Sequence, residues 1–376
     1  MALPLMKTPR SVDIEITNGC NLRCTYCSHF SSAGDVAKDL PLDEWRRFFT
    51  ELNRCAVMNV TLSGGEPFYR QDLKEIIASI VENRMRFSIL SNGTLIEPEM
   101  ASFLAAAGRC DSVQVSIDGA IDITHDAFRG EGNFVKAING IRTLQKFNVP
   151  VAVRVTVHRK NVHELDAVAA LLLEEIGLPS FSTNAASYMG LCRKNTEQTQ
   201  LSVAERSLAM ETLLRLADQY PNRISATAGP LAEATMWAEM KEASREGKPR
   251  MEGRGFLTGC GGPFKNIAVR ADGAYVPCSQ LGHIVLGRIN HDDLCAIWQN
   301  HPVLWEFRNR RFIPLSSFDF CKGCPYIDYC TGNCPALAYN LTGEVNHPSP
   351  DACLRLFEQQ GGKLPERLPH HEPATA

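Results

Sequence analysis

The sequence predicts an α/β protein in which a partial (β/α)6 barrel is followed by a helical bridge and a small cysteine-rich domain. Strand-like segments alternate with helical segments over residues 12–185, which is the pattern of a parallel sheet with right-handed crossovers. The alternation then stops, and from Gly259 to about Phe357 the chain is rich in Cys, Gly and Pro. The expected divisions are a barrel at 1–199, a bridge at 200–255, a cysteine-rich domain at 256–357 and a disordered tail at 358–376.

Six strands and five helices are expected in the barrel. The strands are short segments of apolar and β-branched residues, at 12–16, 58–63, 87–91, 112–117, 151–157 and 181–185. The helices lie between them, at 42–52, 71–83, 97–107, 134–147 and 161–175. A closed (β/α)8 barrel needs two more units, so the sequence predicts an open barrel of six.

The bridge should begin with a helix over 201–220, because Ser202 and Glu205 fit a capping box at its start. Residues 221–258 are mixed in composition, and no further element is predicted there. His370 and His371 are expected to be tail residues rather than ligands.

The composition is that of an ordinary globular protein. The 376 residues include 44% hydrophobic ones and carry a formal charge of −3, which gives no sign of a nucleic-acid partner. No apolar run approaches the roughly 20 residues that span a membrane. The first residues also lack the apolar core of a signal peptide. We therefore expect a cytoplasmic protein without a membrane partner.

The chain has 14 cysteines, and in the cytosol clustered cysteines bind metal more often than they form disulfides. Cys20, Cys24 and Cys27 form a C-x3-C-x2-C run. Three thiolates are one fewer than a closed tetrahedral metal site or an iron–sulfur cluster normally has. The run therefore indicates a cubane cluster with one iron open to another ligand. On this motif alone, a zinc site or disulfides remain alternatives.

With Tyr26 before its third cysteine, the run CNLRCTYC resembles the radical S-adenosylmethionine (SAM) enzymes. In that family the open iron of a [4Fe–4S] cluster binds the amino and carboxylate groups of SAM, and an electron from the cluster splits SAM to a 5'-deoxyadenosyl radical. The resemblance implies that Cys20, Cys24 and Cys27 are the catalytic, cluster-binding residues and that Tyr26 lies at the SAM site.

The run SGGEP ends the second predicted strand and contains Gly64, Gly65 and Glu66. Glycines leave the backbone uncovered, so a ligand can approach it closely. The run resembles the family motif that contacts the SAM amino group, although it would also suit a simple turn.

Two more motifs, SNGT and SIDG, follow the third and fourth strands at the barrel face where ligands bind. They supply Asn92, Ser116 and Asp118 as SAM contacts, although such residues are also common loop formers. Arg129 or Arg154 would pair with the SAM carboxylate through a bidentate fork. The sequence does not choose between the two arginines, and a surface salt bridge would suit either.

Seven cysteines near the C-terminus resemble the pattern of the SPASM domain, which carries auxiliary [4Fe–4S] clusters behind radical SAM barrels. The resemblance implies that the outer cluster, Aux II, is held by Cys321, Cys324, Cys330 and Cys353. The inner cluster, Aux I, would be held by Cys260, Cys278 and Cys334. A zinc ribbon is the alternative, although seven thiolates are too many for one zinc.

Aux I is one cysteine short, because the position about six residues before Cys260, where many relatives have a cysteine, is Arg254. The inner cluster would then have an open iron, a non-cysteine ligand or a distant thiolate such as Cys192.

These expectations describe an oxidoreductase with SAM and three [4Fe–4S] clusters, reduced by a flavodoxin- or ferredoxin-type protein. Enzymes of this architecture mostly modify peptides, so we expect a peptide or protein side chain to be oxidised or cross-linked while the auxiliary clusters take the electron. The first strand begins near residue 12, so a separate protein or the 186–258 region is expected to bind any leader peptide.

Other functions are compatible with the same motifs. Sulfatase maturation is disfavoured, because Ser279 stands where that branch has an acidic residue. Oxidation of a small molecule, such as a tetrapyrrole or a sugar, is a further candidate. From a different class, an iron–sulfur electron-transfer protein or a zinc-binding interaction module would also use these cysteines.

Overall fold

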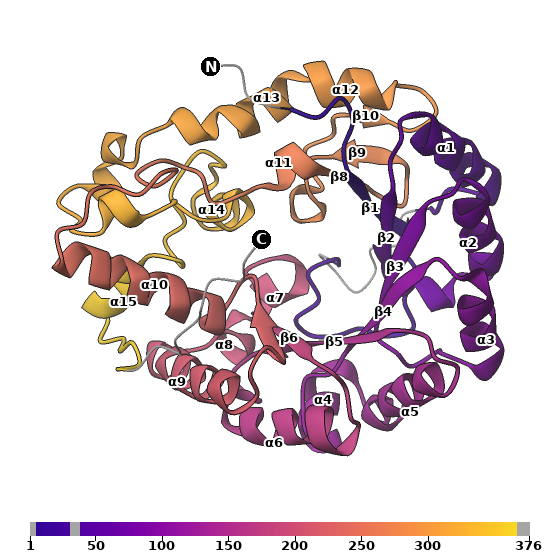
Figure 1. Cartoon of the computed structure of the whole chain (residues 1–376), viewed down its shortest axis with the longest axis horizontal. Helices are drawn as coiled ribbons and strands as arrows, with labels where there is room; N and C mark the ends of the chain where they lie inside the picture. The colour runs from indigo at the N-terminus through magenta and orange to yellow at the C-terminus, as the bar shows by residue number, and fades with distance from the viewer. Residues whose placement is uncertain (1–4, 31–37, 367–376) are drawn as a thin grey trace.

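The computed structural model describes residues 5–30 and 38–366, and its centre is one curved sheet of ten strands (Figure 1). The strand order is β10-β9-β8-β1-β2-β3-β4-β5-β6-β7, and the strands from β8 to β7 run parallel to one another. The barrel strands are β1 (Ser11–Thr17), β2 (Asn59–Gly64), β3 (Arg86–Ser91), β4 (Cys110–Ser116), β5 (Val151–Val157) and β6 (Phe181–Ala185).

All six predicted strands are confirmed, but the parallel sheet is larger than six. A seventh strand, β7 (Ile224–Ala226), pairs with β6, and β8 (Asn266–Val269) pairs with β1. The antiparallel strands β9 (Ala274–Val276) and β10 (Gly287–Arg288) then complete the edge. β7 and β8 have three and four residues, which is too short for a periodic pattern to announce them.

Helices cover the outer face of the sheet (Figure 1). The five predicted barrel helices are confirmed as α1 (Leu42–Arg54), α2 (Leu73–Glu82), α3 (Pro98–Ala107), α5 (Asn133–Lys146) and α6 (Leu165–Ala170), the last extended by a π-helical turn at Leu171–Glu175. A short helix that the sequence did not predict, α4 (Asp122–Arg129), packs on α5.

The predicted bridge begins as expected, with α9 (Val203–Gln219) and a complete Ser202–Glu205 capping box. The sequence predicts no particular element within 221–258, whereas in the structure α10 (Pro230–Arg245) lies there and packs on α9. Its buried residues include Leu231, Ala234, Trp237 and Met240. The charged stretch that follows Met240 hides this periodicity in the sequence. The domain boundaries themselves stay predictions.

The C-terminal region, orange to yellow in Figure 1, consists of short helices and loops. The helices are α11 (Gly262–Lys265), α12 (Leu294–Asn300), α13 (Pro302–Asn309), α14 (Pro335–Thr342) and α15 (Leu354–Gln359). The first part of the predicted tail is ordered, contrary to expectation, because the Lys363 amide donates to Ser207 Oγ of α9 at 3.0 Å. His370 and His371 lie outside the described residues. No described helix is long and apolar enough to cross a membrane.

Candidate active site

The three cysteines of the N-terminal run lie on the loop that leaves the C-terminal end of β1. Cys20, Cys24 and Cys27 line one cavity of about 320 Å³, together with residues from the ends of β2 to β6. This cavity is large enough for a cofactor-sized ligand. Burial raises the pKa of the Cys24 thiol to about 12. A thiolate would therefore form there only when a metal ion stabilises it.

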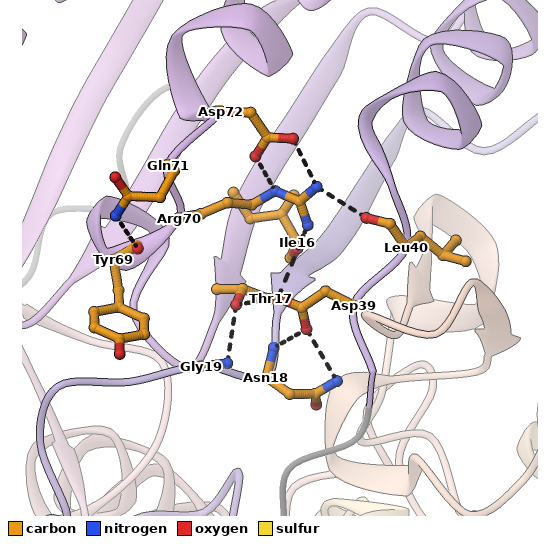
Figure 2. A network of polar contacts seen from close by, with 10 residues as sticks. All are labelled: Ile16, Thr17, Asn18, Gly19, Asp39, Leu40, Tyr69, Arg70, Gln71 and Asp72. Atoms are coloured by element: carbon orange, nitrogen blue, oxygen red, sulfur yellow. Dashed lines mark hydrogen bonds and ion pairs between the residues drawn. The ribbon is translucent and has the colours of Figure 1, made fainter.

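A polar network fixes the end of β1 where the cysteine loop begins (Figure 2). Arg70 donates to the carbonyl of Ile16 at 2.6 Å and forms an ion pair with Asp72. Asp39 accepts hydrogen bonds from the Thr17 hydroxyl at 2.5 Å and from the amide of the next residue at 2.7 Å. These contacts hold the strand end, so the cysteine loop leaves it in one direction.

The glycines of SGGEP are needed for contacts within the chain itself. Gly64 has φ +125°, and a Cβ on Gly65 would lie 2.1 Å from the carbonyl oxygen of Gly19. The Gly65 amide donates to the Thr17 carbonyl, and the Glu66 amide donates to the Gly19 carbonyl, both at 2.8 Å. The turn is thus packed directly on the start of the cysteine loop. Gly64 and Gly65 also line the cavity.

Glu66 joins this turn to the SNGT motif. Its buried carboxylate accepts from the Ser91 hydroxyl at 2.8 Å and from the Asn92 amide at 2.7 Å. Burial raises the Glu66 pKa to about 7. Asn92 in turn faces the cysteine loop, with its Nδ2 4.0 Å from Cys20 Sγ.

Of the other predicted SAM contacts, Tyr26, Ser116, Arg129 and Arg154 line the cavity. Asp118 does not, so its predicted contact with the cofactor is wrong. It is fully buried, and its carboxylate accepts from Tyr26, from Arg129 and from the Thr156 amide. Asp118 therefore orients Tyr26 and Arg129 from behind the cavity wall.

The two candidate arginines differ in their partners. Arg129 is paired with Asp118, whereas Arg154 has no ion pair within the described residues. The recorded contact of the Arg154 side chain is a 3.3 Å hydrogen bond to Ser182 Oγ, and burial lowers its pKa. Arg154 is thus the arginine with an uncompensated charge at this cavity.

Sequence reasoning missed two histidines behind the same wall. His158 packs against Tyr26 and Phe128, and His125 accepts a hydrogen bond from the Asp118 amide at 3.2 Å. Burial lowers the pKa of both imidazoles to about 4, so both are neutral at pH 7. The run HDAFRG after SIDG was the only signal in the sequence that could have found one of them.

The C-terminal cysteines line two separate cavities. One is lined by Cys321, Cys324, Cys330 and Cys353. The other is lined by Cys260, Cys278 and Cys334. This is the grouping that the resemblance implied, although cluster binding itself stays a prediction. Cys192 lies at neither cavity, and its Sγ is 3.3 Å from Thr199 Oγ1.

The donor set of these cavities fits iron–sulfur clusters. All 14 cysteines lie within the described residues and all are free thiols, so the disulfide alternative is not met. Backbone amides of Leu22 and Gly332 donate to Cys20 Sγ and Cys330 Sγ at 3.4 Å, and such hydrogen bonds tune cluster potentials. Among the described residues, no three His, Cys, Asp or Glu side chains are already arranged around a single metal ion. The thiols are grouped by the cavities that they line together.

Comparison with known proteins identifies the family to which the chain belongs. The radical SAM superfamily pattern matches residues 14–172, and the SPASM iron–sulfur cluster-binding domain matches 260–325. An AdoMet-dependent heme synthase of Methanosarcina barkeri is 30% identical over 355 residues, which cover 94% of this chain and 99% of that protein. A PqqA peptide cyclase of Bradyrhizobium diazoefficiens is 26% identical over 96% of this chain and 90% of that protein.

Comparison of the fold with solved structures agrees with these sequence matches. The crystal structure of Streptococcus suis SuiB bound to precursor peptide SuiA superposes with a TM-score of 0.71 at 16% identity, over 93% of this chain and 77% of SuiB. The chain therefore belongs to the radical SAM superfamily and is an iron–sulfur, SAM-dependent enzyme with a C-terminal SPASM domain.

Proposed function

We propose that this enzyme oxidatively modifies a side chain of a peptide or protein, by cross-linking or a related reaction, with SAM and three [4Fe–4S] clusters as cofactors. The observation that carries this proposal is a second cavity that adjoins the SAM cavity. The two cavities share Glu15, Ser28, His29, Ser279 and Gln280. The second cavity is lined mainly by polar groups, which suit the backbone and side chains of an extended peptide.

The shared wall also joins the reaction space to the C-terminal domain. Ser279 and Gln280 line the wall that the two cavities share, and they follow Cys278 directly in the sequence. The inner cysteine site is therefore adjacent to this shared wall. An electron acceptor there would be close to the substrate, as an oxidative reaction requires. Because Ser279 carries no carboxylate, it offers no strong base, and this argues against sulfatase maturation.

When bound, SAM and its cluster supply the radical that removes hydrogen from an unactivated C–H bond. The chain's own residues bind and orient the substrates. Arg154 would pair with the SAM carboxylate, while Asn92 and Ser116 offer hydrogen bonds to SAM. Tyr26 is held against Arg129 and closes this side of the cavity. We assign electron delivery to a flavodoxin- or ferredoxin-type protein and leader binding to a separate protein or to residues 186–258.

The test is anaerobic reconstitution followed by reduction with dithionite and addition of SAM. The proposal expects about twelve irons per chain, four for each cluster, and release of 5'-deoxyadenosine. A short precursor peptide encoded beside the gene should then lose hydrogen atoms in mass spectra. Zinc in place of iron, or no 5'-deoxyadenosine, would refute the enzymatic proposal.

A second candidate is oxidation of an iron tetrapyrrole, because the heme synthase relative matches nearly end to end at 30% identity. The same assay with an iron porphyrin carboxylate separates the two. Conversion of the porphyrin, with no change in the peptide, would favour this candidate.

A further inference from the structure

The cavity lined by Cys260, Cys278 and Cys334 is also lined by a polar side chain from the barrel. Asp13 of β1 lines it. Along β1, Val12 and Ile14 are fully buried in the core, so Asp13 between them points to the opposite face.

The pairing of β1 with β8 explains why Asp13 lines the same cavity as these cysteines. Asp13 is the register partner of Ala268 on β8. β8 lies between two of the thiols in the chain, because Cys260 precedes it and Cys278 follows the hairpin formed with β9. A barrel residue is thereby placed inside the C-terminal cysteine site. The pairing is between segments about 250 residues apart, so the sequence pattern gave no sign of it.

The Asp13 carboxylate is almost unused by the protein. It accepts one long hydrogen bond, from Asn266 Nδ2 at 3.4 Å, and it makes no ion pair within the described residues. Glu15, two residues along the same face, contacts His29 at 3.5 Å. A half-buried carboxylate that lines one cavity with three thiols becomes favourable when a cation joins them.

A second observation near this cavity is the guanidinium of Arg310, which does not line the cavity but lies close enough to Cys260 and Cys334 for their charges to affect it. Arg310 is 2% exposed, and its Nε and Nη2 atoms have no hydrogen-bond partner. No carboxylate pairs with it in the described part of the chain. Burial lowers the pKa of Arg310, and the charges of Cys260 and Cys334 act in the opposite direction. A buried, unpaired cation is costly unless an anionic group faces it. A cluster bound by thiolates and a carboxylate would be such a group.

We infer that the Asp13 carboxylate is the fourth ligand of Aux I, the cluster held by Cys260, Cys278 and Cys334, and that Arg310 offsets its negative charge. This rests on the proposed cluster binding. Aux I is then a closed cluster with one oxygen-ligated iron, and neither substrate nor Cys192 binds it. Replacing a thiolate by a carboxylate changes the charge and hydrogen bonding at one iron, and with them the reduction potential.

The test uses the full-length, reconstituted protein in which Cys20, Cys24 and Cys27 are changed to Ala, so that only auxiliary clusters remain. Potassium cyanide is added as a small ligand for any open iron, and the reduced clusters are followed by electron paramagnetic resonance. We expect cyanide to leave Aux I unchanged in this parent. In Asp13→Asn, which keeps the shape of the side chain, cyanide should bind and shift the spectrum. Asp13→Cys should restore a closed cluster with a different spectrum and potential.

Glu15→Gln is the matched control, on the same strand and face, and should leave the Aux I spectrum as in the parent. Cyanide binding to the parent itself would show an open iron and overturn the inference. Identical spectra for Asp13→Asn and the parent would show a different fourth ligand and also overturn it. If the parent lacks about four of the irons expected for two auxiliary clusters and shows no Aux I signal, the cluster assignment falls as well. 5'-Deoxyadenosine release by the chain with Cys20, Cys24 and Cys27 intact reports separately on the proposed enzyme.

Discussion

Arg129 and Asp118 form an ion pair that is buried behind the wall of the cavity lined by Cys20, Cys24 and Cys27. Asp118 is fully inaccessible, and Arg129 is about nine-tenths buried. Both groups also contact the Tyr26 hydroxyl. The positive charge of Arg129 is therefore already neutralised inside the protein, which leaves the nearby Arg154 as the cation for an anionic ligand.

Replacing Arg154 with Gln should weaken SAM binding by roughly 10- to 100-fold, because a hydrogen bond to a charged group contributes about 1.5–3 kcal/mol. Isothermal titration of SAM into the anaerobic, reconstituted protein measures this. Arg159→Gln is the control, since Arg159 is half-exposed and pairs with Glu205 at 3.2 Å outside the cavity. Equal SAM affinity in both variants would show that Arg154 does not contact SAM.

Changing Gly65 to Ala should destabilise the protein by at least about 1–3 kcal/mol and lower its iron content, because the added Cβ would lie 2.1 Å from the Gly19 carbonyl oxygen. Urea unfolding and iron analysis measure the two effects. Gly282→Ala is the control, because its new Cβ would meet nothing closer than 3.7 Å. A Gly65→Ala protein as stable as this control would mean that the turn can move away from the cysteine loop.

The barrel strands could be predicted from sequence because each has its own apolar pattern. The bounds of β5 and β6 match the prediction, and the other four differ by a residue or two. β8 could not be predicted in the same way, since a four-residue segment among cysteines and glycines carries no period. Its pairing with β1 is a tertiary contact, and it is this pairing that places Asp13 beside the cysteines.

That Cys20, Cys24 and Cys27 lie together at one cavity was predictable, because their motif lies on one loop. The role of Asp118 was not, because SIDG shows a polar residue after a strand but not that α4 follows and brings Arg129 onto it. Likewise, the glycines of SGGEP suggested access for a ligand, whereas their closest neighbours are backbone atoms of Thr17 and Gly19.

Single cysteine substitutions should separate the clusters. Cys20→Ala should abolish 5'-deoxyadenosine formation, because the SAM-binding cluster loses a ligand. Cys353→Ala should remove Aux II and the modified product but spare some SAM cleavage. Cys192→Ala is the control and should retain all iron, since Cys192 lies at none of the three cysteine cavities. Full product from Cys353→Ala would exclude Aux II from the electron path.

Arg206 of α9 joins the barrel side to the C-terminal region. It donates to Glu233 of α10 at 2.8 Å and to the Asp351 carbonyl at 2.8 Å. Arg206→Met should cost about 3–5 kcal/mol, because Glu233 is left buried without its partner. Urea unfolding measures this loss.

Two further variants define this effect. Changing both Arg206 and Glu233 to Met should recover most of the stability, since the buried Glu233 charge is then removed as well and the remaining partner, Asp351, is partly exposed. Arg215→Ala on the same helix breaks an exposed pair with Asp166 and should cost less than about 1 kcal/mol. A similar small cost for Arg206→Met would show that water reaches the Glu233 carboxylate.

The buried histidines contribute a loss of stability in mild acid, which the raised pKa of Glu66, about 7, opposes. Burial lowers the pKa of His125 and His158 to about 4, whereas an unfolded chain binds a proton on each near pH 6.5. Between these values the two imidazoles hold more protons in the unfolded state than in the folded state, so their contribution to the free energy of unfolding falls as the pH drops from about 6.5 toward 4. Each histidine adds a slope of up to about 1.4 kcal/mol per pH unit.

Urea unfolding between pH 5.5 and pH 7.5 measures the slope, and His158→Gln should lower it by up to about 1.4 kcal/mol per pH unit, the contribution of one histidine. The slope is the informative quantity, because losing the contact between His158 and Phe128 lowers stability at every pH. His291→Gln changes an exposed imidazole and should leave the slope as it is. An unchanged slope in His158→Gln would mean that His158 is protonated in the folded protein. Asp118 would then have to share its charge between Arg129 and an imidazolium.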